Sequence, residues 1–300
     1  MGCRRPLDTR LLAEDFVQQV LGKVRDYKKP AAKIVNAELA LKKLEDHPTS
    51  SHQDYRDSEY RTDDQRKLLH KQILTELIKE QRLDNDDDIA LGIGGAKPQE
   101  AKCERIAYIV SGSPASGKSR IATRLADENG AYILDSDYAK RKFPEYDQYS
   151  GGASLVHKES DSIIFDAEDS LFEYCVYEDY NIVIPLVGRT YKSFIKICRR
   201  IMECGYKVHI VNVVLDRYKC VLRAYDRFEA TGRYVPLSYI FDEVGNEPEL
   251  VYFRIKRAYE GEARIGSFAQ ISTDVPKECL PEMLESTTGS PIRLWYEEDL

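Results

Sequence analysis

The stretch IAYIVSGSPASGKS at residues 106–119 decides the fold. Its first five residues are apolar, which is typical of a parallel strand that is buried on both faces. The last eight residues, 112–119, match the pattern Gly-x-x-x-x-Gly-Lys-Ser in full. The residues that follow, RIATRLA at 120–126, read as a helix. Because strand, loop and helix occur in the order of a phosphate-binding loop, we predict that the chain binds ATP or GTP.

The residue types of this loop suit the chemistry of a triphosphate. Gly112 and Gly117 permit backbone angles that turn successive amides toward phosphate oxygens. The start of the helix adds its positive end. Lys118 supplies a charge to the β and γ phosphates, and Ser119 is the expected Mg²⁺ ligand. We therefore predict that the whole loop binds the nucleotide: Gly112, Ser113, Pro114, Ala115, Ser116, Gly117, Lys118 and Ser119.

From residue 105 onward, segments typical of strands and helices alternate. The expected strands are 105–111, 131–135, 181–187, 207–215 and 264–272, and the longest expected helix is 154–177. Such alternation predicts an α/β fold of the P-loop kinase type, with a parallel sheet covered by helices on both faces.

The residues before this region have a different pattern. Apolar residues recur at helical spacing from residue 7 to about 90, and Thr62 to Gln65 resembles a helix capping box. The acidic run Asp84–Asp88 is expected to be a solvated loop. We therefore predict a small all-helical domain at residues 1–96, followed by the kinase domain at residues 97–300.

Composition narrows the choice of partners and compartment. The net charge of −7 argues against a nucleic-acid partner. No apolar run approaches the roughly 20 residues of a membrane helix, so no membrane partner is expected. The seven cysteines are scattered without a Cys-x-x-Cys pair. Reduced thiols and a cytoplasmic location are the simplest interpretation.

Among P-loop proteins, a small-molecule kinase fits best. The Asn-Lys-x-Asp motif of GTPases does not occur, and VNVVLD at 211–216 lacks the Glu that follows the strand in many ATPases. A kinase instead needs an acid after the second strand to receive the acceptor hydroxyl. Asp135 and Asp137 stand there, and Asp137 is the expected general base, with helix capping as its alternative role. Arg227 and Arg233 are the expected cations for the transferred phosphate.

The ordered combination of motifs resembles the zeta-toxin family, the kinase half of bacterial toxin–antitoxin systems, over about residues 105–260. The resemblance rests on these segments: GSPASGKS at 112–119, ILDSDYAK at 133–140 followed by Phe143-Pro144, GRT at 188–190, DRFE at 226–229 and Gly232-Arg233. Family members phosphorylate a sugar hydroxyl of UDP-N-acetylglucosamine.

By this resemblance, Asp137 is the catalytic base, and Lys118 and Ser119 take the phosphate and magnesium positions. The resemblance also implies that Arg227 and Arg233 are the phosphate-binding arginines and that Arg189 is a substrate-side arginine. Asp135 is a further candidate substrate contact, because it follows the same strand.

The chain also departs from the family pattern. Family members have a substrate-contacting Glu where this chain has Pro185-Leu186-Val187. The acceptor of this chain can therefore differ from that of the family. VHKES at 156–160 resembles a segment of longer family members, so His157 and Glu159 are candidate substrate contacts. Longer members carry an N-terminal helical domain that acts as a built-in antitoxin. Residues 1–96 are therefore expected either to inhibit the kinase in cis or to be a plain helical extension.

Two other functions remain open at this stage. The first is a metabolic or effector kinase of another nucleotide hydroxyl, such as that of NAD, which would use the same catalytic residues. The second is a non-catalytic nucleotide-binding effector, against which intact Lys118 and Asp137 argue. A nucleotide sugar is the favoured acceptor, because Lys140, Arg141, Arg189 and Lys192 follow the second and third strands and would suit an anionic substrate.

Overall fold

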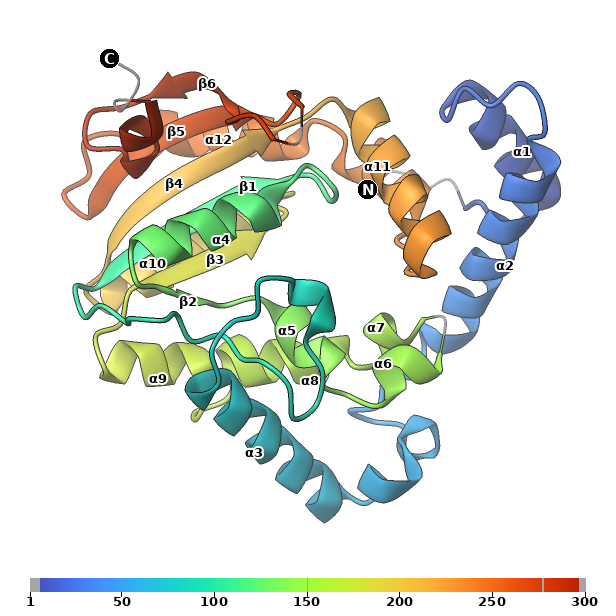
Figure 1. The fold of residues 1–300 in the computed structure, drawn as a ribbon, viewed down its shortest axis with the longest axis horizontal. Coiled ribbons are helices and arrows are strands. Elements are labelled where there is room, and N and C mark those ends of the chain that lie inside the picture. The colour runs from blue at the N-terminus through green and yellow to red at the C-terminus, as the bar shows by residue number, and fades with distance from the viewer. Residues whose placement is uncertain (1–5, 150, 277, 297–300) are drawn as a thin grey trace.

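The computed structural model describes residues 6–149, 151–276 and 278–296. Within these residues, one six-stranded sheet has the order β2-β3-β1-β4-β5-β6 (Figure 1). The strands are β1 (Ile106–Gly112), β2 (Tyr132–Ile133), β3 (Ile182–Leu186), β4 (Lys207–Val214), β5 (Ile265–Ser272) and β6 (Glu282–Ser286). The first five are parallel, and β6 pairs antiparallel with β5 at the sheet edge. The predicted α/β fold is confirmed, and β6 is an addition that sequence reasoning missed.

Strand β1 lies between β3 and β4 in the sheet. Six of its seven residues are buried, as expected for an apolar run with helices on both faces. Helix α4 (Lys118–Glu128) packs on β1, β2 and β3, while α10 (Tyr191–Glu203) and α12 (Glu247–Tyr259) pack together and against β4. The phosphate loop therefore leaves the sheet at the carboxyl ends of the strands, where ligands of such folds bind.

The remaining helices surround this edge of the sheet. They are α1 (Arg10–Gln19), α2 (Lys28–Leu44), α3 (Asp63–Lys79), α5 (Ser136–Arg141), α6 (Glu145–Gln148), α7 (Gly152–Leu155), α8 (His157–Asp161), α9 (Leu171–Tyr177) and α11 (Arg217–Thr231). Short 3₁₀-helices are η1 (Gln53–Tyr55), η2 (Ser58–Tyr60), η3 (Asp86–Asp88) and η6 (Pro291–Tyr296), and short π-helices are η4 (Ser162–Asp166) and η5 (Tyr239–Val244). The capping box that starts α3 is present as predicted.

The expected long helix at residues 154–177 is wrong. The segment is divided into α7, α8, η4 and α9. Its last break has a local cause, since the Ser170 side chain accepts a hydrogen bond from the Glu173 backbone N–H and so starts α9 anew. The breaks fold the segment into a wall beside α5.

The N-terminal helices do not share one core. Helices α1 and α2 bury Phe16, Val17 and Ile34 in a cluster with residues of α11 and η5, such as Tyr225 and Phe241. Helix α3 instead buries its apolar residues in the main core around the sheet: Leu69, Ile73 and Leu77. Figure 1 shows α1 and α2 beside α11, and α3 below α9, on opposite sides of the sheet edge. The predicted boundary at residue 96 remains a prediction, and residues 1–5 and 297–300 lie outside the described part.

The described residues can be compared with two expectations from composition, which concern the cysteines and membrane-spanning helices. The six cysteines that the structure describes are all free thiols. No helix among the described residues is long and apolar enough to cross a membrane.

Candidate active site

The phosphate loop has the backbone that its glycines were expected to provide. Gly112 has a φ of 155° and Gly117 a φ of 89°, both in the region that side chains rarely adopt. A Cβ atom on Gly112 would lie 2.5 Å from the carbonyl oxygen of Val213. Only glycine therefore fits where the loop leaves the sheet.

The polar side chains of the loop are prepared for an anion. The Lys118 side chain is partly buried, and its ammonium donates to the Ser113 carbonyl oxygen at 2.7 Å. Burial lowers the pKa of Lys118 to about 8, so it is still mostly protonated at neutral pH. The Ser116 hydroxyl is buried and has no hydrogen-bond partner in the described structure. A buried polar group without a partner is costly, and a phosphate oxygen would satisfy it.

The two predicted carboxylates take different roles at the start of α5. Asp135 is the N-cap, and its side chain accepts a hydrogen bond from the Asp137 backbone N–H at 2.9 Å. Capping therefore belongs to Asp135, and the Asp137 carboxylate is left to pair with Lys140 at 2.7 Å. Burial and the neighbouring Asp137 charge raise the pKa of Asp135 to about 6. For Asp137, burial is outweighed by Lys140 and Arg141, which lower its pKa to about 2. Asp137 is thus the more acidic member of the pair, and it stays ionised when Asp135 takes up a proton below about pH 6.

Two cavities meet at Asp137. The first, which we call the phosphate-side cavity, has a volume of about 750 Å³. Its lining joins Ser119 at the start of α4, both carboxylates, Arg227 and the segment 84–87, which has three Asp residues and one Asn. Oxygen ligands at Ser119 and Asp135 suit Mg²⁺, which usually takes its remaining ligands from phosphates and water. Among the described residues, no cluster of three or more His, Cys, Asp or Glu side chains is arranged to hold a metal by itself.

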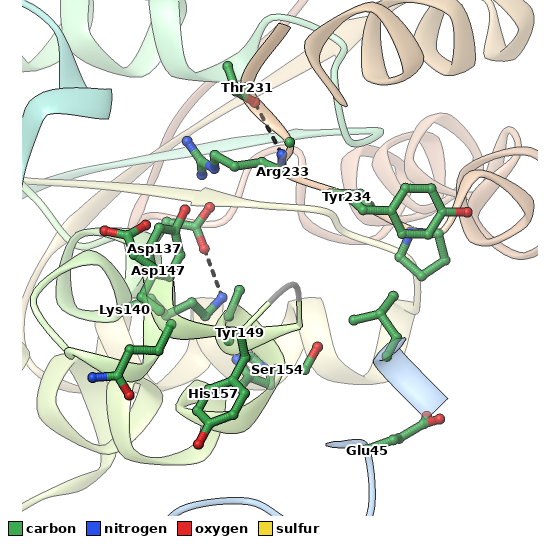
Figure 2. Close-up of a pocket in the computed structure, with 18 of the residues that line it drawn as sticks. Glu45, Asp137, Lys140, Asp147, Tyr149, Ser154, His157, Thr231, Arg233 and Tyr234 are labelled. Atoms are coloured by element: carbon green, nitrogen blue, oxygen red, sulfur yellow. Dashed lines mark hydrogen bonds and ion pairs between the residues drawn. The ribbon is translucent and has the colours of Figure 1, made fainter. Parts of the chain in front are cut away.

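The second cavity, which we call the acceptor-side cavity, has a volume of about 720 Å³. It lies between α6–α8 and the segment that follows α11, and residues Leu41, Glu45 and Pro48, in and just after α2, also line it. Figure 2 shows Asp137, Lys140 and Arg233 on one side of this cavity and Glu45 on another. Its other polar and aromatic lining residues are Tyr146, Asp147, Gln148, Tyr149, Ser154, His157, Lys158, Arg227, Thr231 and Tyr234. A cationic and aromatic lining suits an acceptor that carries phosphates and a base.

The predicted arginines and His157 are brought to this centre. Arg227 lines both cavities, and Arg233 lines the acceptor-side cavity. His157 also lines that cavity, 3.5 Å from Asp161. Burial and the Lys140 charge lower the pKa of His157, so it is neutral at pH 7. Arg227, Arg233 and His157 therefore lie where a substrate could reach them, and their roles in binding or catalysis remain predictions.

Two predicted substrate residues lie elsewhere. Arg189 pairs with Glu243 of η5 at 2.8 Å and lines neither cavity. Glu159 is 4% exposed and binds Arg66 of α3 at 2.7 Å and His70 at 3.1 Å. Its burial against α3 gives Glu159 a structural role, because the same carboxylate is not available to a ligand in the cavity. Both residues lie in the same motif, and only the contact with α3 shows that His157 lines the cavity and Glu159 does not.

Sequence reasoning also missed a buried ionic cluster. The Arg66 guanidinium, 2% exposed, binds Glu159 and also Glu145 at 2.8 Å, and lies 4.6 Å from the Phe143 ring centroid. Glu145 is fully buried and accepts a further hydrogen bond from the Asp57 backbone N–H. The cluster ties α3 to the α6–α8 wall of the acceptor-side cavity. Helical spacing gave no sign of it, since an Arg on a helix is usually solvated.

The acidic run Asp84–Asp88 was expected to be a solvated loop, but two of its side chains have partners in the structure. Asp87 pairs with Arg141 at 3.0 Å and also with Arg233. Asp86 accepts a hydrogen bond from the Tyr138 hydroxyl at 2.7 Å. The run was visible in the sequence, but its arginine partners lie far away along the chain.

A mostly parallel sheet with a phosphate loop, a carboxylate after the second strand and arginines on and just after α11 defines a P-loop kinase-like fold. The family model described as Zeta toxin matches residues 93–252, more than half of the chain. The chain therefore belongs to the zeta-toxin family.

The comparison with solved structures supports the fold through one match with a TM-score above 0.5. A structure from the PezAT chromosomal toxin-antitoxin system of Streptococcus pneumoniae is 16% identical, with 81% of this chain and 89% of that chain covered, at a TM-score of 0.53. The complex of AvrRxo1-ORF1 and -ORF2 with ATP is 16% identical over 91% and 76% of the two chains, at a TM-score of 0.43. A gluconokinase from Sinorhizobium meliloti 1021 is 16% identical over 58% and 86%, at a TM-score of 0.33. A search of curated proteins found no match.

Proposed function

We propose that the chain is an ATP-dependent kinase that phosphorylates a sugar hydroxyl of UDP-N-acetylglucosamine and thereby acts as a toxin. Membership of the zeta-toxin family supports the phosphotransferase class. The single observation that carries the acceptor class is that Asp137 lies where the phosphate-side cavity meets a second cavity lined by cations and tyrosines.

In the proposed reaction, the acceptor hydroxyl lies beside the Asp137 carboxylate, in line with the γ-phosphate. Its oxygen forms the new bond to phosphorus, the bond to the β-phosphate oxygen breaks, and ADP leaves. Asp137 accepts the hydroxyl proton late in the transfer. Bound Mg²⁺ would neutralise charge on the phosphates, with Ser119 and Asp135 as its protein ligands.

The low pKa of Asp137 also fits this sequence of events. Lys140 and Arg141 hold it low in the absence of substrate. Anionic phosphates beside these cations would take over part of their charge and raise the pKa of Asp137, making it a better proton acceptor. Lys118 and the Arg227 and Arg233 guanidiniums would then follow the charge that spreads over the transferred phosphoryl group.

A dinucleotide such as NAD is the second candidate acceptor. The end of β3 carries Pro185 and Leu186, so no carboxylate or hydroxyl side chain reads sugar hydroxyls from that strand. An NAD hydroxyl would meet the same cations and the same base. The chemistry of the transfer is unchanged, and only the acceptor differs.

The deciding experiment incubates the full-length chain with ATP and each acceptor separately and follows the products by mass spectrometry. We expect one added phosphate on UDP-N-acetylglucosamine and none with the Lys118→Ala variant. A phosphate on NAD alone would overturn the acceptor and keep the kinase. No transfer to any acceptor by a chain that binds ATP would favour a non-catalytic effector.

We also propose that residues 1–96 restrain the kinase in cis. The similar PezAT structure comes from a toxin-antitoxin system, which supports an inhibitory partner for this fold. Because α3 buries Leu69, Ile73 and Leu77 in the main core, removal of residues 1–96 would expose that core. Single substitutions at the contact surface therefore test this restraint better than a deletion does.

A further inference from the structure

The acidic turn, defined here as residues 84–88, lies over the phosphate-side cavity. Asp84, Asn85, Asp86 and Asp87 line this cavity together with Ser119 at the start of α4. Negative side chains at the entrance of a triphosphate site are unexpected on electrostatic grounds, because they repel the ligand. Their partners explain how they are held there.

Asp87 binds two of the cations that surround Asp137. Its carboxylate accepts hydrogen bonds from Arg141 Nη2 at 3.0 Å and from Arg233 Nη1. The Arg141 side chain is 9% exposed. A single carboxylate oxygen, Asp87 Oδ1, therefore bridges the two guanidiniums, as one oxygen of a phosphate group would.

The guanidinium groups at this site retain unused hydrogen-bonding capacity. Arg141 Nε and Arg227 Nε are buried and have no hydrogen-bond partner in the described structure. A carboxylate offers two oxygens, whereas a terminal phosphate offers three and a higher charge. The site is thus only partly satisfied by Asp87 and is better matched to a phosphoryl group.

The acidic turn can leave the Arg141–Arg233 site without moving the residues on either side of it, because each flank has its own contacts to the rest of the chain. On one side, Arg82 donates to the Ala131 carbonyl oxygen at 2.9 Å and pairs with Asp127. On the other, the buried Lys142 ammonium donates to the Ala90 and Ile93 carbonyl oxygens at 2.9 and 3.1 Å. The turn between them is held by the Asp86–Tyr138 hydrogen bond and by the Asp87 pairs.

We propose that Asp87 is an internal phosphate mimic, which occupies the Arg141–Arg233 site until ATP displaces the acidic turn. This inference rests on the proposed kinase function and names the element that would restrain it. Asp87 and a triphosphate would bind the same guanidinium groups of Arg141 and Arg233, so the acidic turn and the nucleotide compete. The apparent ATP affinity is then reduced in proportion to the fraction of molecules in which the turn is withdrawn.

The test is ATP binding by titration calorimetry without any acceptor, using the full-length chain. Asp87→Asn keeps the size of the side chain and removes the charge that binds both arginines. We expect this variant to bind ATP about five- to tenfold more tightly than the unmodified chain, since two partly exposed charge pairs are lost. The matched control is Asp88→Asn, an equal change of charge at an exposed neighbour that does not line the cavity.

Two results would overturn the proposal. Unchanged affinity in Asp87→Asn would show that the ion pairs do not compete with ATP. Weaker affinity would show that Asp87 assists binding, for example through the metal. Failure of the kinase function would appear separately, as tighter ATP binding in Asp87→Asn together with no transfer to any acceptor.

A second measurement needs no variant. Amide hydrogen exchange at residues 84–88 of the unmodified chain should speed up when ATP is added, because the turn leaves its arginine partners. Exchange at the clamped flanks should change little. Slower exchange in the turn on ATP binding would contradict displacement.

Discussion

The two cavities that share Asp137 differ in what the chain itself places in them. The phosphate-side cavity contains carboxylates of the acidic turn, which bind arginines expected to serve the phosphates. The acceptor-side cavity is lined by four Lys and Arg side chains, three tyrosines and three carboxylates. Both receive a contribution from the first 96 residues, the acidic turn in one and α2 in the other. The difference teaches that the first 96 residues contact both sides of the site in different ways, and we propose that they restrain the nucleotide side while they complete the acceptor side.

Asp137→Asn should have the largest effect, because this residue belongs to both cavities. The amide keeps a hydrogen-bond partner for the acceptor but accepts no proton, so transfer should fall about 10³- to 10⁴-fold. ATP binding, which depends on the phosphate loop, should persist. Single-turnover transfer and calorimetry on the same preparation measure the two. Should Asp135→Asn lose transfer while Asp137→Asn keeps it, the assignment of the two carboxylates would be reversed.

Arg66→Ala should have the next largest effect and should act on the acceptor side through stability. It leaves Glu145 and Glu159 buried without their cation, which should lower the free energy of unfolding by about 3–4 kcal/mol. Urea unfolding measures this loss. The control is Lys67→Ala on the same helix, whose side chain is largely exposed and should cost at most about 0.5 kcal/mol. Equal stability of the two variants would show that α3 does not secure the α6–α8 wall.

Leu41→Ala should have the smallest effect and tests whether α2 is a true wall of the acceptor-side cavity. Removing the side chain should raise the KM for the acceptor by about three- to tenfold, as expected for lost apolar contact. The affinity for ATP should stay the same. Leu39→Ala, on the exposed face of α2, is the control. If both variants leave the KM unchanged, α2 does not touch the acceptor, and the two cavities differ less than the structure indicates.

Much of the fold could be predicted, because the signals are local. The five parallel strands correspond to the five apolar segments that sequence analysis identified. The helix at 154–177 was wrong, because Ser170 starts a new helix within an otherwise helical pattern. Strand β6 was missed because residues 282–286 contain only two apolar residues, Met283 and Leu284, and are at most partly buried at the sheet edge, so they carry a weak strand signal.

The candidate site was predicted in part. The phosphate loop, Asp135, Asp137, His157, Arg227 and Arg233 line the site or adjoin it. Arg189 and Glu159 resembled substrate contacts by their motifs, yet they pair with Glu243 and Arg66. A motif shows which residue types occur together, but it does not show which way each side chain points.

The sequence by itself determined the features whose partners lie close along the chain. The phosphate loop lies within eight consecutive residues, and the caps of α3 and α5 join residues two or three positions apart. Tertiary structure alone decided the rest, since Arg66 and Glu159 are 93 positions apart, and Asp87 and Arg233 are 146 apart. Periodicity reports only the local geometry of the backbone. Long-range ion pairs depend on how whole elements pack, so no local pattern reveals that an acidic turn lies on the arginines of the active site.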